Sequence, residues 1–435
     1  MIVNQGDFKH FKFDRWCWLR NGLILSNISR RFTLYGMFHS FLSIILMAFG
    51  SGFSLLFSSQ ILITWILDSG GSIEQVGLVG LLTFPYLCSF LWMPGLDYLS
   101  RYFSRQYMIS FGFFALSGCL LSSAYLDPVM QYKYVMMLGF LMALICSTND
   151  HVIEAYRVKI LQENEYKLGV TLSLMAFRLG IMLAGGVGLI YAASFSWQRM
   201  YQQAAFIVLS LAISVLFAPT EEKSEQNSLS FHFNMSWNFL KALLNEYHFV
   251  GVLSTYRLSV FWLELMMPAL LMQFLQLSVF DLGVLYKFYG VIGLLTGGVA
   301  VNLFVDQSKI VKALFISLIA QIGVCGLFFL ISFFPNVSYE IIGVVVFIEC
   351  FLQGVLGTVS TIWLMQKTRS DLPAFSFSVW HGLSALGRVW IGPIAAIIIG
   401  DFGWRYFTAV GVLLAILSVI ICQYHLSMLH QDSHH

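Results

Sequence analysis

The chain has 435 residues, of which 58% are hydrophobic and only 11% are charged, against roughly 25% charged in an ordinary globular domain. So little polar surface excludes a water-soluble fold, and a net charge of +2 spread over short segments provides no basic surface for nucleic acid. Lipid must therefore surround most of the chain, and twelve helices of about 20 residues would account for its hydrophobic content.

Apolar runs as long as a membrane helix follow one another along the chain. They lack the alternation of barrel strands, so we expect an all-α integral membrane protein with twelve transmembrane helices. The expected spans are 38–67, 75–96, 106–126, 134–156, 168–193, 200–219, 249–276, 282–305, 313–334, 341–365, 373–400 and 406–425. The expected division is a tail at 1–32, a six-helix bundle at 33–219, a linker at 220–248, a six-helix bundle at 249–425 and a tail at 426–435.

Lysine and arginine are distributed unevenly over the segments between the spans. With the N-terminus inside, the cytoplasmic segments hold 17 of them, and the outer loops hold only Lys133, Arg199 and Arg405. Short loops rich in basic residues remain in the cytoplasm, so we expect both termini and the linker there. Residues 1–31 lack the short apolar run and small-residue cleavage site of a cleaved signal.

The two halves of the sequence resemble each other at an offset of about 208 residues. Asp97 and Arg101 after the second span correspond to Asp306 and Lys309 after the eighth, and Trp197 corresponds to Trp404. Such a repeat resembles the two pseudo-symmetric six-helix bundles of the major facilitator superfamily. Chance recurrence of interfacial Trp and Arg is the alternative. Glycines gather in spans 5, 8 and 11, where small residues allow helices to approach closely.

Eight charged residues fall inside the expected spans, and their formal charges sum to zero. They are Arg178, Arg257, Lys287, Arg388, Asp150, Glu154, Glu264 and Glu349. A lone charge at mid-bilayer costs about 2.5–3.5 kcal/mol, so these groups must be paired or hydrated. Depth along the helices predicts that Asp150 pairs with Arg178 and that Glu349 pairs with Arg388. All eight lie on spans 4, 5, 7, 8, 10 and 11, which predicts a water-accessible pathway between the bundles.

Asp150 and Glu154 lie four residues apart and share one face of span 4, with Arg157 three residues further on. Two carboxylates so close repel each other, which favours proton uptake by one of them. A structural latch with Arg157 or Arg178 is an equally good interpretation. Span 1 has no charge but offers a polar patch that could bind an uncharged part of a ligand or join helices. This patch consists of Ser58, Ser59, Gln60 and Thr64.

Several motifs resemble those of the AmpG-like muropeptide permease family of the major facilitator superfamily. They are Pro85–Tyr86 followed by Phe90–Pro94 and Asp97, the segment Asn149–Arg157, Phe177–Gly180, Lys287, and Gly387–Val389 followed by Gly392–Pro393. The resemblance implies import of anhydromuropeptides across the bacterial inner membrane, driven by protons. It assigns proton coupling to Asp150, with Glu154 beside it, and binding of an anionic solute to Arg178, Arg257, Lys287 and Arg388. Ser89, Asn149 and Val260 depart from the family pattern at polar positions.

Proton-coupled import of a peptidoglycan fragment is thus the first functional hypothesis, and import of another bulky polar solute such as a siderophore is the alternative. We expect no enzyme, because the sequence lacks a nucleophile elbow, an HExxH motif and a phosphate loop. The cysteines and histidines are not spaced as metal ligands, so no metal or cofactor is expected. The expected partners are a small-molecule solute, protons and the lipid bilayer, with no nucleic acid, and we expect a monomer.

Overall fold

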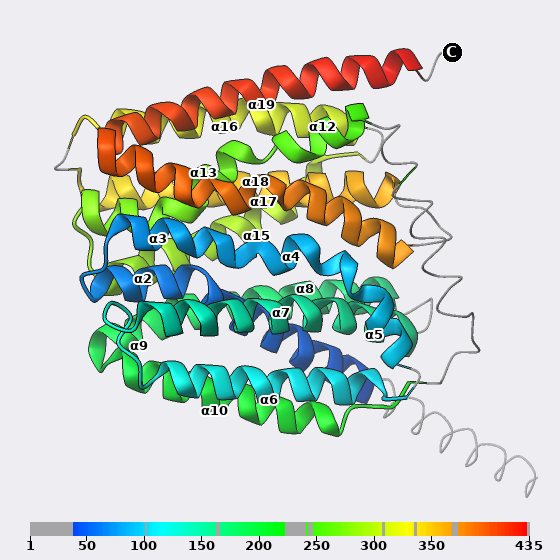
Figure 1. Cartoon of the computed structure of the whole chain (residues 1–435). Coiled ribbons are helices and arrows are strands. Elements are labelled where there is room, and N and C mark those ends of the chain that lie inside the picture. The colour runs from blue at the N-terminus through cyan, green and yellow to red at the C-terminus, as the bar shows by residue number, and fades with distance from the viewer. Residues whose placement is uncertain are drawn as a thin grey trace, which may run out of the picture.

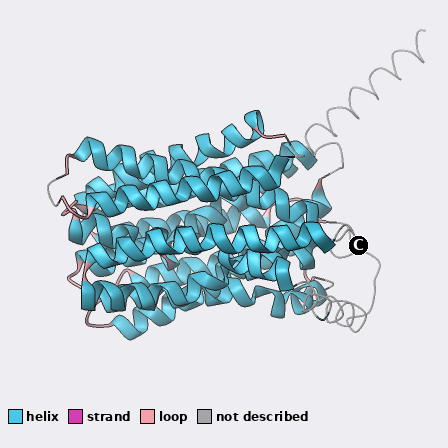
Figure 2. Cartoon of the chain, turned by 90° about the horizontal axis from the view of Figure 1, so that it is seen from above, coloured by secondary structure: helices cyan, strands magenta, loops and turns pink. Residues whose placement is uncertain are grey.

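The computed structural model describes residues 38–100, 102–161, 166–221, 241, 247–306, 309–334, 337–367 and 373–432. In these ranges it contains twelve helical segments long and apolar enough to cross a membrane, and no strand (Figures 1 and 2). The predicted all-α membrane fold and its twelve spans are confirmed. The predicted N-terminal tail at 1–32 and most of the linker at 220–248 lie outside the described residues.

The first six spans agree with the expected ones to within a few residues, and spans 1, 2 and 5 are assembled from shorter helical pieces. Span 1 covers Phe38–Asp68 and contains η1 (Leu56–Ser58) and α2 (Gln60–Asp68); span 2 contains α3 (Ile73–Val79), η2 (Gly80–Thr83), α4 (Phe84–Cys88) and η3 (Ser89–Leu91), followed by α5 (Met93–Leu99). Spans 3 to 6 are α6 (Arg105–Ser123), α7 (Tyr132–Ile160), α8 with η4 and α9 (Tyr166–Met182, Leu183–Val187, Gly188–Ser194), and α10 (Trp197–Leu216).

The last six spans show the same mixture of continuous and interrupted helices. Span 7 contains α12 (Tyr247–Thr255), α13 (Leu258–Ala269) and η5 (Leu270–Phe274), and span 8 contains α14 (Val279–Leu282), η6 (Gly283–Tyr289) and α15 (Gly290–Phe304). Spans 9 to 12 are α16 (Ile310–Ile331), α17 (Tyr339–Lys367), α18 (Pro373–Phe402) and α19 (Trp404–Asp432). Because α19 continues to Asp432, part of the segment predicted as a tail at 426–435 is helical.

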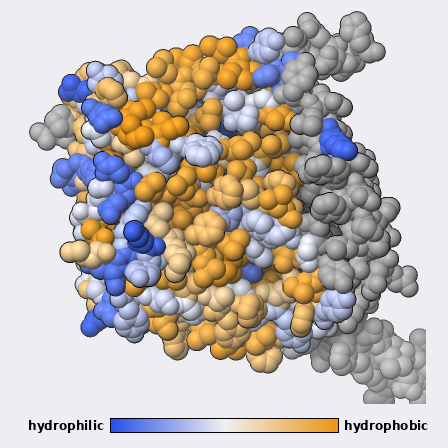
Figure 3. Space-filling view, viewed as in Figure 1, coloured by the Kyte–Doolittle hydropathy of each residue, from blue (hydrophilic) through white to orange (hydrophobic). Residues whose placement is uncertain are grey.

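Apolar side chains cover the outside of the molecule between its two ends. Phe111, Phe206, Ile316 and Leu413 on α6, α10, α16 and α19 are all more than half exposed. Figure 3 shows hydrophobic residues across the middle of one face and hydrophilic residues gathered at its left end. An apolar band next to a polar end is the surface that a bilayer solvates, and the four helices named, which are spans 3, 6, 9 and 12, contribute exposed apolar side chains to it.

The two halves of the chain meet along three pairs of spans. In the half of the molecule away from the described C-terminus, α2 contacts α13 and α9 contacts α14 (Figure 1). Helix α18 packs against α3 in that half and continues past η2 to α4, toward the other end of the molecule. The π-helical segments η4 and η6 also contact each other. These seams place spans 1, 5, 7, 8 and 11 around the middle of the molecule, so their inward side chains can share one site.

The contact between α3 and α18 depends on glycine. A β-carbon on Gly392 would lie 2.4 Å from the carbonyl oxygen of Gly77 and 3.2 Å from the α-carbon of Gly80. Real side-chain carbons do not approach backbone oxygen so closely, so these helices touch at a spacing that only glycine allows.

We therefore expect Gly392→Ala to lower the thermal unfolding midpoint of the purified protein, because overpacking costs about 1–3 kcal/mol. Gly326→Ala on α16 is the matched control, since a β-carbon there would meet nothing within 4 Å. Equal midpoints for the two variants would contradict the close contact between α3 and α18.

Candidate functional site

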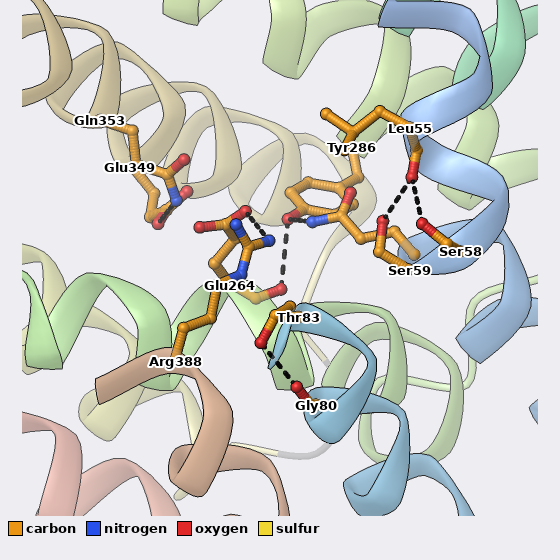
Figure 4. Close-up of polar contacts among 11 residues, drawn as sticks. Leu55, Ser58, Ser59, Gly80, Thr83, Glu264, Tyr286, Glu349, Gln353 and Arg388 are labelled. Atoms are coloured by element: carbon orange, nitrogen blue, oxygen red, sulfur yellow. Dashed lines mark hydrogen bonds and ion pairs between the residues drawn. The ribbon is translucent and has the colours of Figure 1, made fainter. Parts of the chain in front are cut away.

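The centre of the second bundle contains an ion pair between two side chains predicted as site residues. Arg388 Nη2 on α18 lies 3.0 Å from Glu264 Oε1 on α13, and the two side chains are 29% and 18% exposed. Figure 4 shows the two side chains meeting, with Glu349 and Gln353 on one side and Tyr286 on the other. A partly exposed pair in the membrane interior indicates that this region is accessible to water or to a polar ligand.

Arg257 lies beside this pair because span 7 is interrupted. Tyr256 and Arg257 form a turn between α12 and α13, and Arg257 is the residue that precedes α13. Its guanidinium carbon lies 5.0 Å from the centre of the Phe261 ring, and that of Arg388 lies 5.6 Å from the same ring. One aromatic ring therefore contacts both cations, and cation–π attraction stabilises each of them.

We call Glu264, Arg388, Arg257 and Phe261 the central cluster. Its two cations outnumber its one acid. Glu264 neutralises Arg388, whereas Arg257 forms no ion pair with a described residue, and its Nε is buried without a hydrogen-bond partner there. An unsatisfied guanidinium N–H in a desolvated place is costly. Arg257 is thus suited to bind an anionic group of a ligand.

Glu349 does not pair with Arg388 as the depth calculation predicted. It is fully buried on α17, where it accepts hydrogen bonds from the side-chain amide of Gln353 and from the thiol of Cys350. The prediction was wrong because rise per residue fixes the depth of a side chain but not the direction in which it leaves its helix. The carboxylate that reaches Arg388 comes from α13 instead.

The predicted pair of Asp150 and Arg178 is also absent from the ion pairs of the described residues. Asp150 on α7 accepts a hydrogen bond from the hydroxyl of Ser51 in span 1, which joins spans 1 and 4. No cationic side chain among the described residues forms an ion pair with this carboxylate. Span 4 therefore contains an acid whose one described side-chain hydrogen bond is to a neutral hydroxyl.

Glu154 has a different environment from Asp150, although the two lie four residues apart. It forms an ion pair with Arg157, and Arg157 Nη1 donates a hydrogen bond of 3.1 Å to Ser173 on α8. The side chain of Glu154 is 56% exposed and that of Arg157 is 8% exposed. Arg157 thus balances the charge of Glu154 and links span 4 to span 5.

Arg178 extends from α8 of the first bundle toward the second bundle. A β-carbon on Gly298 of α15 would lie 3.1 Å from Arg178 Nη1. The guanidinium therefore lies against the backbone of span 8, and it forms no ion pair with a described residue. Lys287, the remaining predicted cation, lies in η6, but its side chain is outside the described part of the structure.

The polar patch of span 1 divides into two parts. The hydroxyls of Ser58 and Ser59 donate to the carbonyl of Leu55 (Figure 4), and that of Thr64 donates to Gln60 in its own helix. The side-chain amide of Gln60 instead donates to the hydroxyl of Tyr286, 3.0 Å away on span 8, and both residues are buried. Gln60 therefore connects the two bundles directly.

Tyr286 also connects this contact between the bundles to the ion pair. Its hydroxyl lies 3.5 Å from the backbone carbonyl oxygen of Glu264, whose side chain holds Arg388. The two short segments that supply Gln60 and Glu264, α2 and α13, pack against each other. A movement of Glu264 that alters its ion pair with Arg388 would therefore also alter the position of Tyr286, which forms the hydrogen bond to Gln60 between the bundles.

Four residues of the site were not predicted: Ser51, Phe261, Tyr286 and Gln353. They are neutral, so a search for charges inside apolar runs could not detect them. Gln353 had a usable signal, because it follows Glu349 by four residues and therefore shares its helix face. The partners of Ser51 and Tyr286 come from distant spans, and only the packing of the helices brings them together.

The geometry and the order of the helices agree with comparisons to known proteins. A model of the Major Facilitator Superfamily matches residues 40–391. The chain belongs to this superfamily. Major facilitators transport small solutes, and membership of this superfamily together with the twelve apolar helices makes this chain a multi-pass membrane protein.

Among curated proteins, the chain is similar to the Anhydromuropeptide permease of Escherichia coli strain K12, with 24% identity over 87% of this chain and 78% of the permease. It is also similar to the Putative transporter AmpG 3 of Rickettsia typhi, with 25% identity over 82% of this chain and 89% of that protein. The resemblance predicted from the motifs is confirmed by these relatives.

Solved structures share the fold of this major facilitator at low sequence identity. The crystal structure of a mutant of the nucleoside transporter NupG has a TM-score of 0.69 at 12% identity and covers 89% of this chain and 99% of its own. A D-xylose-proton symporter has a TM-score of 0.63 at 11% identity and covers 88% of this chain and 97% of its own. At such identities the likeness shows the fold alone.

The ion pair of the site can be tested by a double-mutant cycle. We expect Glu264→Gln and Arg388→Gln each to lower the thermal unfolding midpoint, because each leaves one charge without its partner. The double variant should be less destabilised than the sum of the two, with a coupling of about 1–2 kcal/mol for a partly exposed pair. Strictly additive effects in purified protein would show that the two side chains do not interact.

Proposed function

We propose that this major facilitator is a secondary active transporter that imports a peptidoglycan fragment, an anhydromuropeptide, driven by protons. The observation that carries the proposal is the state of the charges between the bundles. Arg178 from the first bundle and Arg257 from the second form no ion pair with a described residue, and neither does Asp150. Similarity to an anhydromuropeptide permease supports the choice of solute.

The unpaired cations are suited to an anionic solute. A guanidinium binds a carboxylate through two parallel hydrogen bonds, and the peptide part of a peptidoglycan fragment carries carboxylates. The guanidinium carbons of Arg257 and Arg388 lie 5.0 and 5.6 Å from the centre of the same Phe261 ring, so one solute can reach both. Because Arg178 belongs to the other bundle, a solute bound by all three would contact both halves of the protein.

Asp150 is the better candidate for the proton-coupling residue, and Glu154 is the weaker one. The charge of Glu154 is already balanced by Arg157, so its protonation would break an existing ion pair. Asp150 has a hydroxyl partner in Ser51, and protonation would make it neutral without leaving an uncompensated cation among its described partners. The carboxylate can therefore gain and lose a proton at little structural cost.

Alternating access assigns a role to the contacts between the bundles. The two bundles rock about a central site, so contacts on one side must open when those on the other side form. If both termini are cytoplasmic, as the loop charges predict, the Gln60–Tyr286 hydrogen bond and the packing of α2 on α13 would close the periplasmic side. We propose that the two bundles of one chain form the pathway and that the protein acts as a monomer.

Uptake into proteoliposomes tests the solute. Vesicles containing the purified protein, acidic outside and neutral inside, should accumulate radiolabelled anhydromuropeptide unchanged. Accumulation of an iron-siderophore instead would favour the alternative solute. Ser89 and Val260 differ from the pattern of the muropeptide permease family at polar positions, which is compatible with a different solute. Chemical conversion of the solute would contradict a role as a transporter.

Asp150→Asn should fold normally but lose accumulation driven by the pH gradient, because an amide cannot exchange a proton. The measurement is solute uptake with and without an acidic exterior, together with the thermal midpoint in detergent. Asp401→Asn is the control, since Asp401 is an exposed carboxylate at the end of α18. Undiminished uptake by Asp150→Asn would remove Asp150 from the coupling mechanism.

A further inference from the structure

A notch in span 8 accommodates the guanidinium of Arg178. A β-carbon added to Gly298 would lie 3.1 Å from Arg178 Nη1, 3.4 Å from Arg178 Nη2 and 3.1 Å from Thr358 Oγ1 on α17. Both terminal nitrogens of the arginine therefore lie against a position on α15 that has no side chain. The arginine comes from α8 of the first bundle, and the notch belongs to the second.

The corresponding arginine in the second half has a different environment. Arg388 follows Arg178 by 210 residues, close to the offset of the internal repeat, and it is neutralised by Glu264 in its own bundle. The residues that precede Glu264 by 208–210 positions are Ser54, Leu55 and Leu56, none of which is an acid. Span 1 therefore has no acid at the position equivalent to Glu264, and Arg178 forms no ion pair with a described residue.

We propose that Gly298 is a positioning residue, which leaves space for the guanidinium of Arg178 so that this arginine can bind the solute carboxylate in the way the proposed function requires. This inference deepens the proposed function and rests on it for the identity of the solute. A guanidinium binds a carboxylate with two N–H groups only when its planar fork faces the anion. A methyl group at position 298 would require the guanidinium to move by a few tenths of an ångström, which changes the direction in which its two N–H groups face the anion.

The first test needs no natural solute. Sulfate serves as the probe anion, and its apparent Kd is obtained from the rise of the thermal midpoint with sulfate, compared with chloride at equal ionic strength. Gly298→Ala and Arg178→Gln should each weaken sulfate binding about tenfold, as expected for the loss of one charge-assisted hydrogen bond. Gly357→Ala, next to Thr358, adds the same methyl group where nothing lies within 4 Å and should bind sulfate like the wild type.

A double variant separates positioning from packing. If Gly298 acts through Arg178, then Gly298→Ala should not weaken sulfate binding further in an Arg178→Gln background. An equal effect of Gly298→Ala in both backgrounds would show a packing role and overturn the inference. Wild-type affinity in Gly298→Ala, or no sulfate binding by the wild-type protein, would overturn it as well.

Uptake by proteoliposomes then connects the notch with transport. For labelled anhydromuropeptide, Gly298→Ala should raise KM about tenfold and leave the maximal rate near that of Gly357→Ala. A lower maximal rate with an unchanged KM would contradict the positioning role. If the wild-type protein does not import this solute while the sulfate results hold, the proposed function fails and the role of Gly298 in positioning Arg178 stands.

Discussion

The cost of an isolated charge in a low-dielectric interior governs the arrangement of this protein. Lipid surrounds the helices, so a charged side chain must find an opposite charge, a set of hydrogen bonds or water. The structure shows the first two solutions: Glu264 pairs with Arg388 and Glu154 with Arg157, while Glu349 accepts hydrogen bonds from Gln353 and Cys350. Arg178, Arg257 and Asp150 form no ion pair with a described residue, and these are the groups that we propose for binding the solute and the proton.

The central cluster joins two tasks that a transporter must coordinate. Glu264 holds Arg388 with its carboxylate, and its backbone carbonyl lies next to the tyrosine hydroxyl that receives the Gln60 amide from the other bundle. Interruptions in two helices make this arrangement possible, because span 1 is broken before Gln60 and span 7 is broken at Arg257. In continuous helices, the side chains of Gln60 and Glu264 would leave their helices in other directions.

Hydropathy was sufficient for the fold, because twelve apolar runs of sufficient length have few other structures open to them in a membrane. The charged members of the site were also visible in the sequence, since a charge within an apolar run is rare. Their partners were not, as the mistaken assignment of Glu349 to Arg388 shows. Partner choice depends on helix rotation and on local breaks such as Tyr256–Arg257, and neither the hydrophobic pattern nor the helical rise contains that information.

Two of the three contacts between the bundles differ in the type of helix that forms them. Along α3 and α18, glycines place backbone against backbone, which leaves little freedom for the helices to slide. Along spans 5 and 8, a β-carbon on Gly283 would also lie close to backbone, 3.1 Å from the carbonyl oxygen of Gly186, but there the contacting segments η4 and η6 are π-helical and have wider turns than an α-helix. Rotation of one bundle against the other would thus use the close α3–α18 contact as its axis. The change in distance between the bundles would be accommodated by altered turns in η4 and η6.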